Sequence, residues 1–252
     1  MQLKDLKNLI EENDFNFKKK FGQNFIIDEN IINAIINKSE IDADTLIIEI
    51  GVGAGALTTK LADIAKNVLC YEIDEDLREI LDITLKDKHN VEIIYKDFLK
   101  AKVLDDIKKY KYKNLYVIAN LPYYITTPII VKIIEDKLDA DKIVVMVQKE
   151  VGDRFKAKPN TKEYNSLSIF LNYHYDIKKL MDVSRNVFLP KPNVDSIVIQ
   201  FSKKSNNYSV KNEDVFYKLI KDSFVQKRKT IRNNLRGYDL NKIETILKNY
   251  GF

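Results

Sequence analysis

Short apolar runs alternate with amphipathic stretches along the first 160 residues. Continuous runs rich in Val, Ile and Leu predict buried strands at residues 45–50, 67–72, 91–95, 115–119 and 142–148. Apolar residues at helical spacing predict helices at residues 56–64, 75–85, 127–136 and 150–157. This alternation indicates right-handed βαβ units, so we expect an α/β fold with a doubly wound, Rossmann-like sheet.

The last third of the chain follows a different pattern. Residues 166–175 and 195–201 are expected to be strands of an antiparallel hairpin at the edge of the sheet. A polar linker over 202–209 precedes helical patterns at 213–225, 227–235 and 240–248. We therefore predict two domains, an α/β domain over residues 1–202 and a small all-helical domain over residues 203–252.

Charge sharpens this division. Residues 203–252 hold 12 Lys and Arg against 5 Asp and Glu, a net of +7, whereas residues 1–202 carry a net of −2. A near-neutral body with a basic helical module suggests a polyanionic partner, although a solvated lysine-rich surface would give the same count. The single cysteine, Cys70, excludes an internal disulfide and favours a reducing compartment.

A glycine turn follows the first predicted strand and precedes a helix. It reads Gly51-Val52-Gly53-Ala54-Gly55, which is neither the dinucleotide spacing nor a P-loop. Glu72 ends the second strand, where a carboxylate can accept hydrogen bonds from ribose hydroxyls. Asp97 follows the third strand and can accept from an adenine amine, with Phe98 flanking the ring. These residues describe an adenosine pocket without a phosphate cradle, and the ligand that fits is S-adenosylmethionine.

The fourth strand ends in Asn120-Leu121-Pro122-Tyr123, the most specific signal in the chain. This motif resembles the signature of methyltransferases that act on exocyclic amino nitrogens. The lone pair of adenine N6 is delocalised into the ring, so two acceptors that bind its hydrogens would favour a pyramidal, nucleophilic nitrogen. The Asn120 side-chain oxygen and the Leu121 carbonyl can supply them, Pro122 fixes the turn, and Tyr123 can stack on the base.

The resemblance covers residues 18–236 and identifies the chain with the small-subunit ribosomal RNA adenine N6,N6-dimethyltransferases, the kasugamycin-resistance type. Its other motifs are Phe21–Phe25, Gln148–Val151, Asn165–Ser168, Val187–Ser196 and the basic segment Lys227–Leu235. Tyr124 stands where the family usually has Asn, a departure that could narrow the pocket mouth.

The resemblance also assigns site residues. It implies catalytic roles for Asn120, Leu121, Pro122, Tyr123 and Phe188, with Phe188 sandwiching the target adenine opposite Tyr123. The expected cofactor-binding residues are Asn24, Ile26, Gly51, Gly53, Glu72, Asp97, Phe98 and Asn120. RNA contacts are expected from a basic helix face made by Lys227, Arg228, Lys229 and Arg232, helped by an arm at residues 18–20.

The implied reaction is methylation of two adjacent adenines in a hairpin loop near the 3′ end of small-subunit rRNA, during ribosome assembly. We expect the partner to be the immature small ribosomal subunit, with no metal, no membrane span, a monomeric state and a cytoplasmic location. Two alternatives stay open: a macrolide-resistance-type adenine methylase of large-subunit rRNA, and a non-catalytic RNA-binding assembly factor. A DNA adenine methylase is less compatible with the Phe188 segment and the basic helical module.

Overall fold

The computed structural model describes residues 17–18, 21–205, 210–226 and 228–251. It divides into two compact units, Met1–Gly152 with Ile177–Lys203, and Asp153–Asp176 with Lys204–Phe252. We call the first the sheet unit and the second the helical unit. The sequence places a boundary at residue 203, and the structure adds residues 153–176 to the helical unit.

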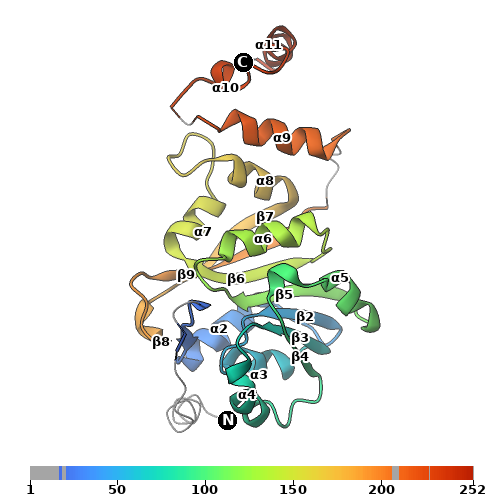
Figure 1. Cartoon of the computed structure of the whole chain (residues 1–252), viewed down its shortest axis with the longest axis vertical. Helices are drawn as coiled ribbons and strands as arrows, with labels where there is room; N and C mark the ends of the chain where they lie inside the picture. Colours follow the sequence, from blue (N-terminus) through green and yellow to red (C-terminus); the bar gives the residue numbers. More distant parts are fainter. Residues whose placement is uncertain (1–16, 19–20, 206–209, 227, 252) are drawn as a thin grey trace. The chain divides into compact units, whose positions relative to one another are not determined.

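The sheet unit is built on seven strands in the order β4-β3-β2-β5-β6-β9-β7 (Figure 1). Neighbours from β4 to β6 run parallel, and β9 runs antiparallel to β6. The strands are β2 (Thr45–Ile50), β3 (Asn67–Glu72), β4 (Val91–Tyr95), β5 (Asn114–Asn120), β6 (Lys142–Gln148), β7 (Tyr175–Val183) and β9 (Ser196–Lys203). The five predicted parallel strands and the Rossmann-like fold class are confirmed.

Helices connect and cover these strands. The α-helices are α2 (Glu29–Ser39), α3 (Ala56–Ala62), α4 (Arg78–Thr84), α5 (Val103–Asp106), α6 (Thr126–Glu135) and α7 (Lys149–Phe155). Short 3₁₀ helices are η2 (Glu75–Leu77), η3 (Phe98–Lys100), η4 (Ile107–Lys109) and η5 (Arg185–Val187). A separate small sheet pairs β1 (Phe25–Ile26) antiparallel with β8 (Phe188–Leu189).

The order of the strands explains where a ligand can bind. The crossovers through α3 and α4 lead outward from β2 in one direction, and the crossover through α6 leads from β5 to β6 in the other. Because such crossovers are right-handed, α3 and α4 cover one face and α6 covers the opposite face. The order therefore reverses between β2 and β5, and ligands bind beyond the carboxyl ends of strands at such a reversal.

One core packs α2, α3 and α4 against a single face of the sheet. Alternate residues of the central strands contribute to it, as Ile47, Val68, Ile118 and Val144 show. Their neighbours in the strands point to the other face and are also buried, which is why these strands are continuous apolar runs.

The edge of the sheet differs from the prediction. Residues 166–175 were expected to form a strand, but Ser166–His174 is the helix α8. Asn165 caps this helix by accepting hydrogen bonds from the amides of Leu167 and Ser168, and Leu167, Phe170 and Leu171 have helical spacing. The strand beside β9 is β7, which starts at Tyr175.

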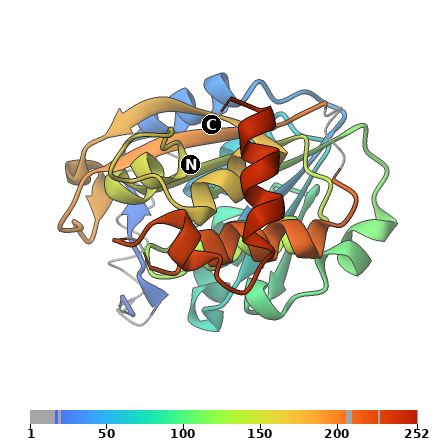
Figure 2. The ribbon, with the colours of Figure 1, turned by 90° about the horizontal axis from the view of Figure 1, so that it is seen from above.

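The helical unit contains α8, α9 (Glu213–Ser223), α10 (Ile231–Asn234) and α11 (Leu240–Asn249). Figures 1 and 2 show α11 crossing α9. Of the helix predicted over 227–235, residues 228–230 are not helical, because α10 begins at Ile231, and Lys227 lies outside the described residues. Thr230 caps α10 by accepting from the Asn233 amide, which fixes the helix start at this point.

Candidate functional site

A single pocket at the carboxyl ends of β2, β3 and β5 gathers the predicted cofactor residues. Its lining includes Asn24, Ile26, Gly51, Gly53, Glu72, Asp97, Phe98, Asn120, Leu121, Pro122 and Tyr123. These residues come from five segments of the sequence. The pocket lies at the reversal of strand order, where the topology predicts a ligand site.

The glycine turn between β2 and α3 forms one wall of the pocket. Gly53 has a φ of +57°, a left-handed conformation that residues with a Cβ rarely adopt. A Cβ at this position would lie 2.9 Å from the nearest ring carbon of Phe25. The turn therefore needs glycine both for its conformation and for the close approach of the segment that contains Phe25.

Glu72 is buried at the end of β3, with 4% of its surface exposed. Its Oε2 accepts from the Gly53 amide at 3.0 Å, and its Oε1 accepts from the amides of Ile73 and Asp74 at 2.8 and 2.9 Å. Burial raises the pKa of Glu72, although these backbone donors favour the charged form. Backbone contacts thus fix the carboxylate, and its further lone pairs can accept from ribose hydroxyls.

The residues after β4 form the next part of the wall. Asp97 Oδ1 accepts from the Leu99 amide at 3.0 Å and so caps η3. Phe98 is 4% exposed, with its ring packed edge-on to Tyr71, so it supplies apolar backing at the pocket. Ile73, which the sequence analysis missed, lines the pocket and is 41% exposed. The sequence feature that could have indicated Ile73 is a large apolar residue directly after Glu72, the acid that ends β3.

An N-terminal strap, residues 21–26, closes another side of the pocket. Gln23 Nε2 donates to Asp74 Oδ2 at 2.6 Å, and Lys18 Nζ forms an ion pair with Asp74 Oδ1 at 2.5 Å. Lys18 also pairs with Asp76. Lys18 is therefore bound to acids beside the pocket, and its expected contact with RNA stays a prediction. Lys19 and Lys20 lie outside the described residues.

Asn120 occupies the end of β5 with a defined orientation. Its Nδ2 donates to the carbonyl oxygen of Asn24 at 2.8 Å. A carbonyl can only accept, so the nitrogen of the amide must face Asn24, and Oδ1 is left as the acceptor. The following carbonyl, that of Leu121, accepts no hydrogen bond from the described part of the chain. Asn120 and Leu121 both line the pocket, so both acceptors belong to pocket-lining residues.

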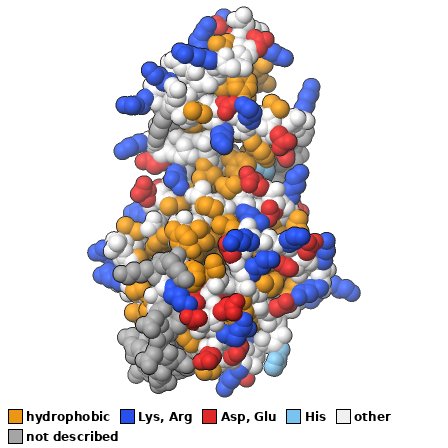
Figure 3. Space-filling view, in the orientation of Figure 1, with side chains coloured by type: hydrophobic (Ala, Val, Ile, Leu, Met, Phe, Trp, Pro, Cys, Tyr) orange, Lys and Arg blue, Asp and Glu red, His pale blue; other side chains and the backbone are white. Residues whose placement is uncertain are grey.

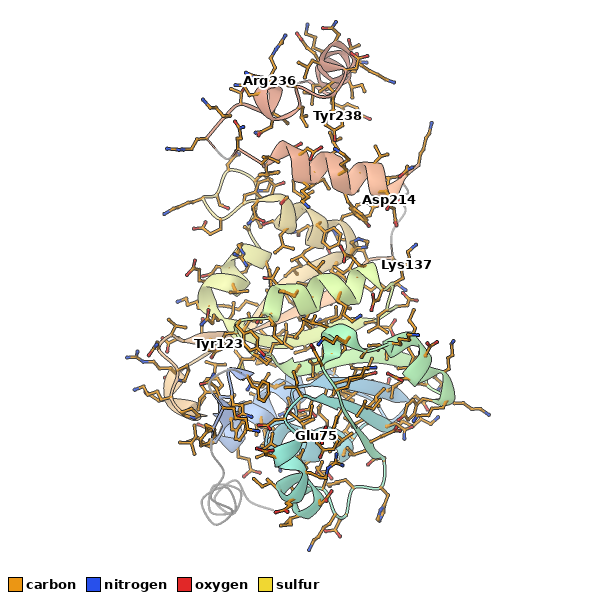
Figure 4. The ribbon with its side chains drawn as sticks, viewed as in Figure 1. Glu75, Tyr123, Lys137, Asp214, Arg236 and Tyr238 are labelled. Atoms are coloured by element: carbon orange, nitrogen blue, oxygen red, sulfur yellow. The ribbon has the colours of Figure 1, made fainter. Side chains whose placement is uncertain are left out.

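Tyr123 lies in the loop that follows β5 (Figure 4). Its hydroxyl and the Ser196 hydroxyl are 2.7 Å apart, and Ser196 is fully buried at the start of β9. Burial raises the pKa of Tyr123, so the phenol stays neutral at physiological pH. Ser196 is a second residue that the sequence analysis missed as part of the site, although it belongs to the 187–196 motif.

Phe188 is not brought to the pocket. Its side chain is 2% exposed and belongs to the core on the α2–α4 face, and in the small sheet it pairs with Ile26. The expectation that it sandwiches a base opposite Tyr123 receives no support from this position. β8 instead supports β1, which carries the pocket residue Ile26.

A buried acid that the sequence analysis missed, Glu49, also lines the pocket. Glu49 on β2 is 1% exposed, and its Oε2 is 3.8 Å from the Cys70 Sγ. Burial, together with the nearby charge of Glu72, raises the pKa of Glu49 to about 8. Glu49 is therefore mostly protonated at neutral pH, and Cys70 is a buried core residue.

The predicted RNA-binding residues belong to the helical unit. Arg228 and Lys229 are exposed in a turn before α10, and Arg232 is exposed within α10, 3.6 Å from Glu244. Lys227 lies outside the described residues. They do not share the face of one helix, because 228 and 229 precede the helix start. Figure 3 shows Lys and Arg side chains projecting around the helices of this unit.

Two further features bear on function. Among the described residues, no group of three His, Cys, Asp or Glu side chains could hold a metal ion. In the same part of the chain, no helix is both long enough and apolar enough to cross a bilayer.

The pocket fits the adenosyl part of S-adenosylmethionine. A glycine turn without side chains, a fixed carboxylate at Glu72 and a second carboxylate at Asp97 stand at three successive strand ends. The strap closes over this end through Gln23 and Asn24.

Comparisons with known proteins agree with this geometry. The chain matches the family model described as ribosomal RNA adenine dimethylase over residues 14–249. Proteins of Bacillus mycoides and Bacillus cereus, both named ribosomal RNA small subunit methyltransferase A, are 48% identical over 232 residues. The match covers 91% of this chain and 80% of each relative.

Solved structures show the same fold. A dimethyladenosine transferase from Plasmodium falciparum has a TM-score of 0.73 and 27% identity, covering 89% of this chain and 78% of that one. The 23S rRNA methyltransferase ErmE has a TM-score of 0.71 and 25% identity, covering 90% of both chains. These matches confirm the expected fold, the enzyme class and S-adenosylmethionine as methyl donor. The chain belongs to the ribosomal RNA adenine dimethylase family.

Proposed function

We propose that this protein dimethylates the N6 amines of two adjacent adenines in a hairpin loop near the 3′ end of small-subunit rRNA, during assembly of the subunit. The observation that carries the proposal is the orientation of Asn120, whose Nδ2 is bound to Asn24 so that Oδ1 remains as acceptor. Relatives named for the small subunit, at 48% identity, support the choice of rRNA.

The proposed cofactor contacts follow from the pocket. Glu72 accepts from the ribose hydroxyls, Asp97 from the adenine amine, and Gly51 and Gly53 allow the backbone to approach the ligand. Asn24, Ile26 and Phe98 complete the wall. When bound, S-adenosylmethionine supplies an electrophilic methyl group on a sulfonium.

The chain's own residues then act on the target amine. Asn120 Oδ1 and the Leu121 carbonyl accept its two hydrogens, which favours a pyramidal nitrogen with its lone pair directed at the methyl group. Pro122 holds the turn because its φ is fixed. Tyr123 stacks on the base, with its ring held by the contact to Ser196. The methylated amine is acidic enough to lose its proton to water, so no strong base is required.

The RNA contacts beyond one base are proposed for the helical unit. A pocket that holds a single adenine cannot select one rRNA site, so shape and phosphate contacts must do so. The exposed cations Arg228, Lys229 and Arg232 supply positive charge for phosphates. We propose that the protein works as a monomer in the cytoplasm, where small subunits are assembled.

Methyl transfer to undermethylated small ribosomal subunits tests this function. The wild-type chain should transfer methyl groups to these subunits and not to large subunits. Asn120→Ala should lower kcat by about 100-fold or more while cofactor affinity stays close to wild type, because the lost acceptor matters most in the transition state. Asn114→Ala is the matched control, since Asn114 begins the same strand at its other end and bonds to Asp42.

A second candidate, the macrolide-resistance type that acts on large-subunit rRNA, is raised by the likeness to ErmE. Macrolide resistance in cells that express the chain, with transfer only to large-subunit rRNA, would favour it. Normal subunit binding without any methyl transfer would favour a non-catalytic assembly factor.

A further inference from the structure

Tyr124 adjoins Tyr123 in sequence and lines the same pocket, with 54% of its surface exposed. An aromatic ring in this position could contact either the incoming base or the cofactor. The surroundings of the two neighbouring tyrosines distinguish these possibilities.

The ring of Tyr124 lies against the strap. A Cβ built on Gly22 would be 3.1 Å from its Cδ1 and 3.3 Å from its Cε1. Gly22 has a φ of +59°, so glycine provides both the backbone conformation and the space for the ring. The packing leaves little room between the ring and the strap.

The strap itself is held in place at this point. Asn24 Nδ2 donates to the Gly22 carbonyl oxygen at 3.0 Å, and the Asn24 carbonyl accepts from Asn120. Gln23 is bound to the buried Asp74 at 2.6 Å. Tyr124 therefore packs on a wall that is fixed by hydrogen bonds of Gly22 and of the two residues that follow it.

The charged groups that surround Tyr124 and Tyr123 also differ. Partial burial and the charges of Asp97 and Glu72 raise the pKa of Tyr124. The pKa of Tyr123 responds instead to burial, Ser196 and Asp195. The two carboxylates proposed to bind adenosine therefore influence the pKa of Tyr124. The Tyr123 hydroxyl is instead hydrogen-bonded to Ser196 on β9.

We propose that Tyr124 is a cofactor-retaining residue: with Gly22 it forms the outer wall of the adenosine end of the pocket, and it does not stack on the target base. The inference rests on the proposed function, since it assumes S-adenosylmethionine in this pocket. The adenosyl group is common to the cofactor and to its product S-adenosylhomocysteine, so Tyr124 slows the release of both.

Cofactor release rates and subunit binding, measured separately, test this role. Tyr124→Ala should release S-adenosylmethionine and S-adenosylhomocysteine about tenfold faster and bind both correspondingly more weakly. Tyr124→Phe, which keeps the ring, should stay within about twofold of wild type. Gly22→Ala should change release in the same direction as Tyr124→Ala, because the added methyl displaces the ring. Tyr112→Ala, a partly exposed tyrosine outside the pocket, is the control.

The affinity for small subunits without cofactor should be unchanged in every variant. Normal cofactor release by Tyr124→Ala, with weaker subunit binding, would overturn the inference and assign Tyr124 to the RNA. Normal release by Gly22→Ala and Tyr124→Ala alike would overturn it without touching the proposed function. A wild-type chain that does not bind S-adenosylmethionine would overturn both.

Discussion

The acids near the pocket of the sheet unit and the candidate RNA-binding cations of the helical unit differ in how far they are buried. In the sheet unit, three acids near the pocket are almost fully buried: Glu49, Glu72 and Asp74 are 1%, 4% and 1% exposed. In the helical unit, the candidate RNA-binding cations Arg228, Lys229 and Arg232 are exposed. Figure 4 marks another exposed cation, Arg236, beside α10.

The difference matches two kinds of ligand. A desolvated carboxylate held by backbone amides has a fixed position and interacts strongly at short range, which suits a small ligand. A solvated cation fixes no geometry but attracts a polyanion over about a Debye length, roughly 8–10 Å at 0.10–0.15 M salt. Changes to the buried acids should therefore alter stability and cofactor binding, and changes to the exposed cations should alter salt dependence.

The largest expected effect is on the pH dependence of stability, when Glu49 is replaced. Its pKa is raised from 4.5 to about 8 by burial, so the folded state favours the proton and this stabilisation is complete below pH 4.5. It is lost as pH rises from about 4.5 to 8, because the unfolded chain gives up the proton more easily. Glu49→Gln should remove this loss, which is on the order of 5 kcal/mol for a pKa raised from 4.5 to about 8.

Urea unfolding of the cofactor-free protein at pH 5 and pH 9 measures this difference. Wild type should lose more stability between the two pH values than Glu49→Gln does. Equal losses would mean that Glu49 is already ionised in the folded protein.

The second largest expected effect is on cofactor affinity, when Glu72 is replaced. Glu72→Gln replaces one acceptor oxygen by an NH₂ group, so either the glycine turn or the ribose hydroxyls lose a partner. We expect a loss of about 1–3 kcal/mol in cofactor binding, or roughly 5- to 150-fold. Calorimetry with S-adenosylhomocysteine measures it, with Glu92→Gln as control, since Glu92 bonds to Lys109 and Tyr110 outside the pocket. Unchanged affinity would remove Glu72 from the cofactor site.

The next prediction concerns the exposed cations of the helical unit and the binding of small ribosomal subunits. Neutralising Arg228, Lys229 and Arg232 to Gln should weaken binding of small subunits and reduce the salt slope of the affinity by about 2. Cofactor affinity should not change. Neutralising Lys86, Lys102 and Lys111, exposed cations of the sheet unit, removes the same charge and serves as control. A wild-type slope in the first variant would place the docking face elsewhere.

The smallest expected effect concerns Ser196 and Tyr123. Ser196→Ala and Tyr123→Phe each remove one side of the same hydrogen bond, worth about 1 kcal/mol. Each should lower kcat/KM by about fivefold, and the double variant should be no worse than either single one. Tyr112→Phe controls for loss of a hydroxyl outside the pocket. Additive losses would show that the two hydroxyls act separately.

A reading of the amino-acid sequence alone predicts the parallel strands, the glycine turn and the Asn-Leu-Pro-Tyr motif. Each depends on interactions close in sequence or on a burial pattern that repeats along one segment. The runs in β2, β3 and β6 are apolar on both faces, so the strands could be bounded without knowing their neighbours. The resemblance added Asn24 and Ile26, whose pocket position no local pattern indicates.

The contacts between these parts depend on long-range packing that is visible only in the folded protein. Asn120 owes its orientation to a carbonyl 96 residues away, and Tyr123 owes its partner to a strand 73 residues away. Phe188 is buried because β8 pairs with β1, which the sequence did not predict. The helix α8 was mistaken for a strand because its aromatic residues suit either structure. The helix forms because Asn165 caps its start and because α8 packs on α9. Side-chain partners far apart in sequence fix these features, and a single sequence carries no signal for such pairings.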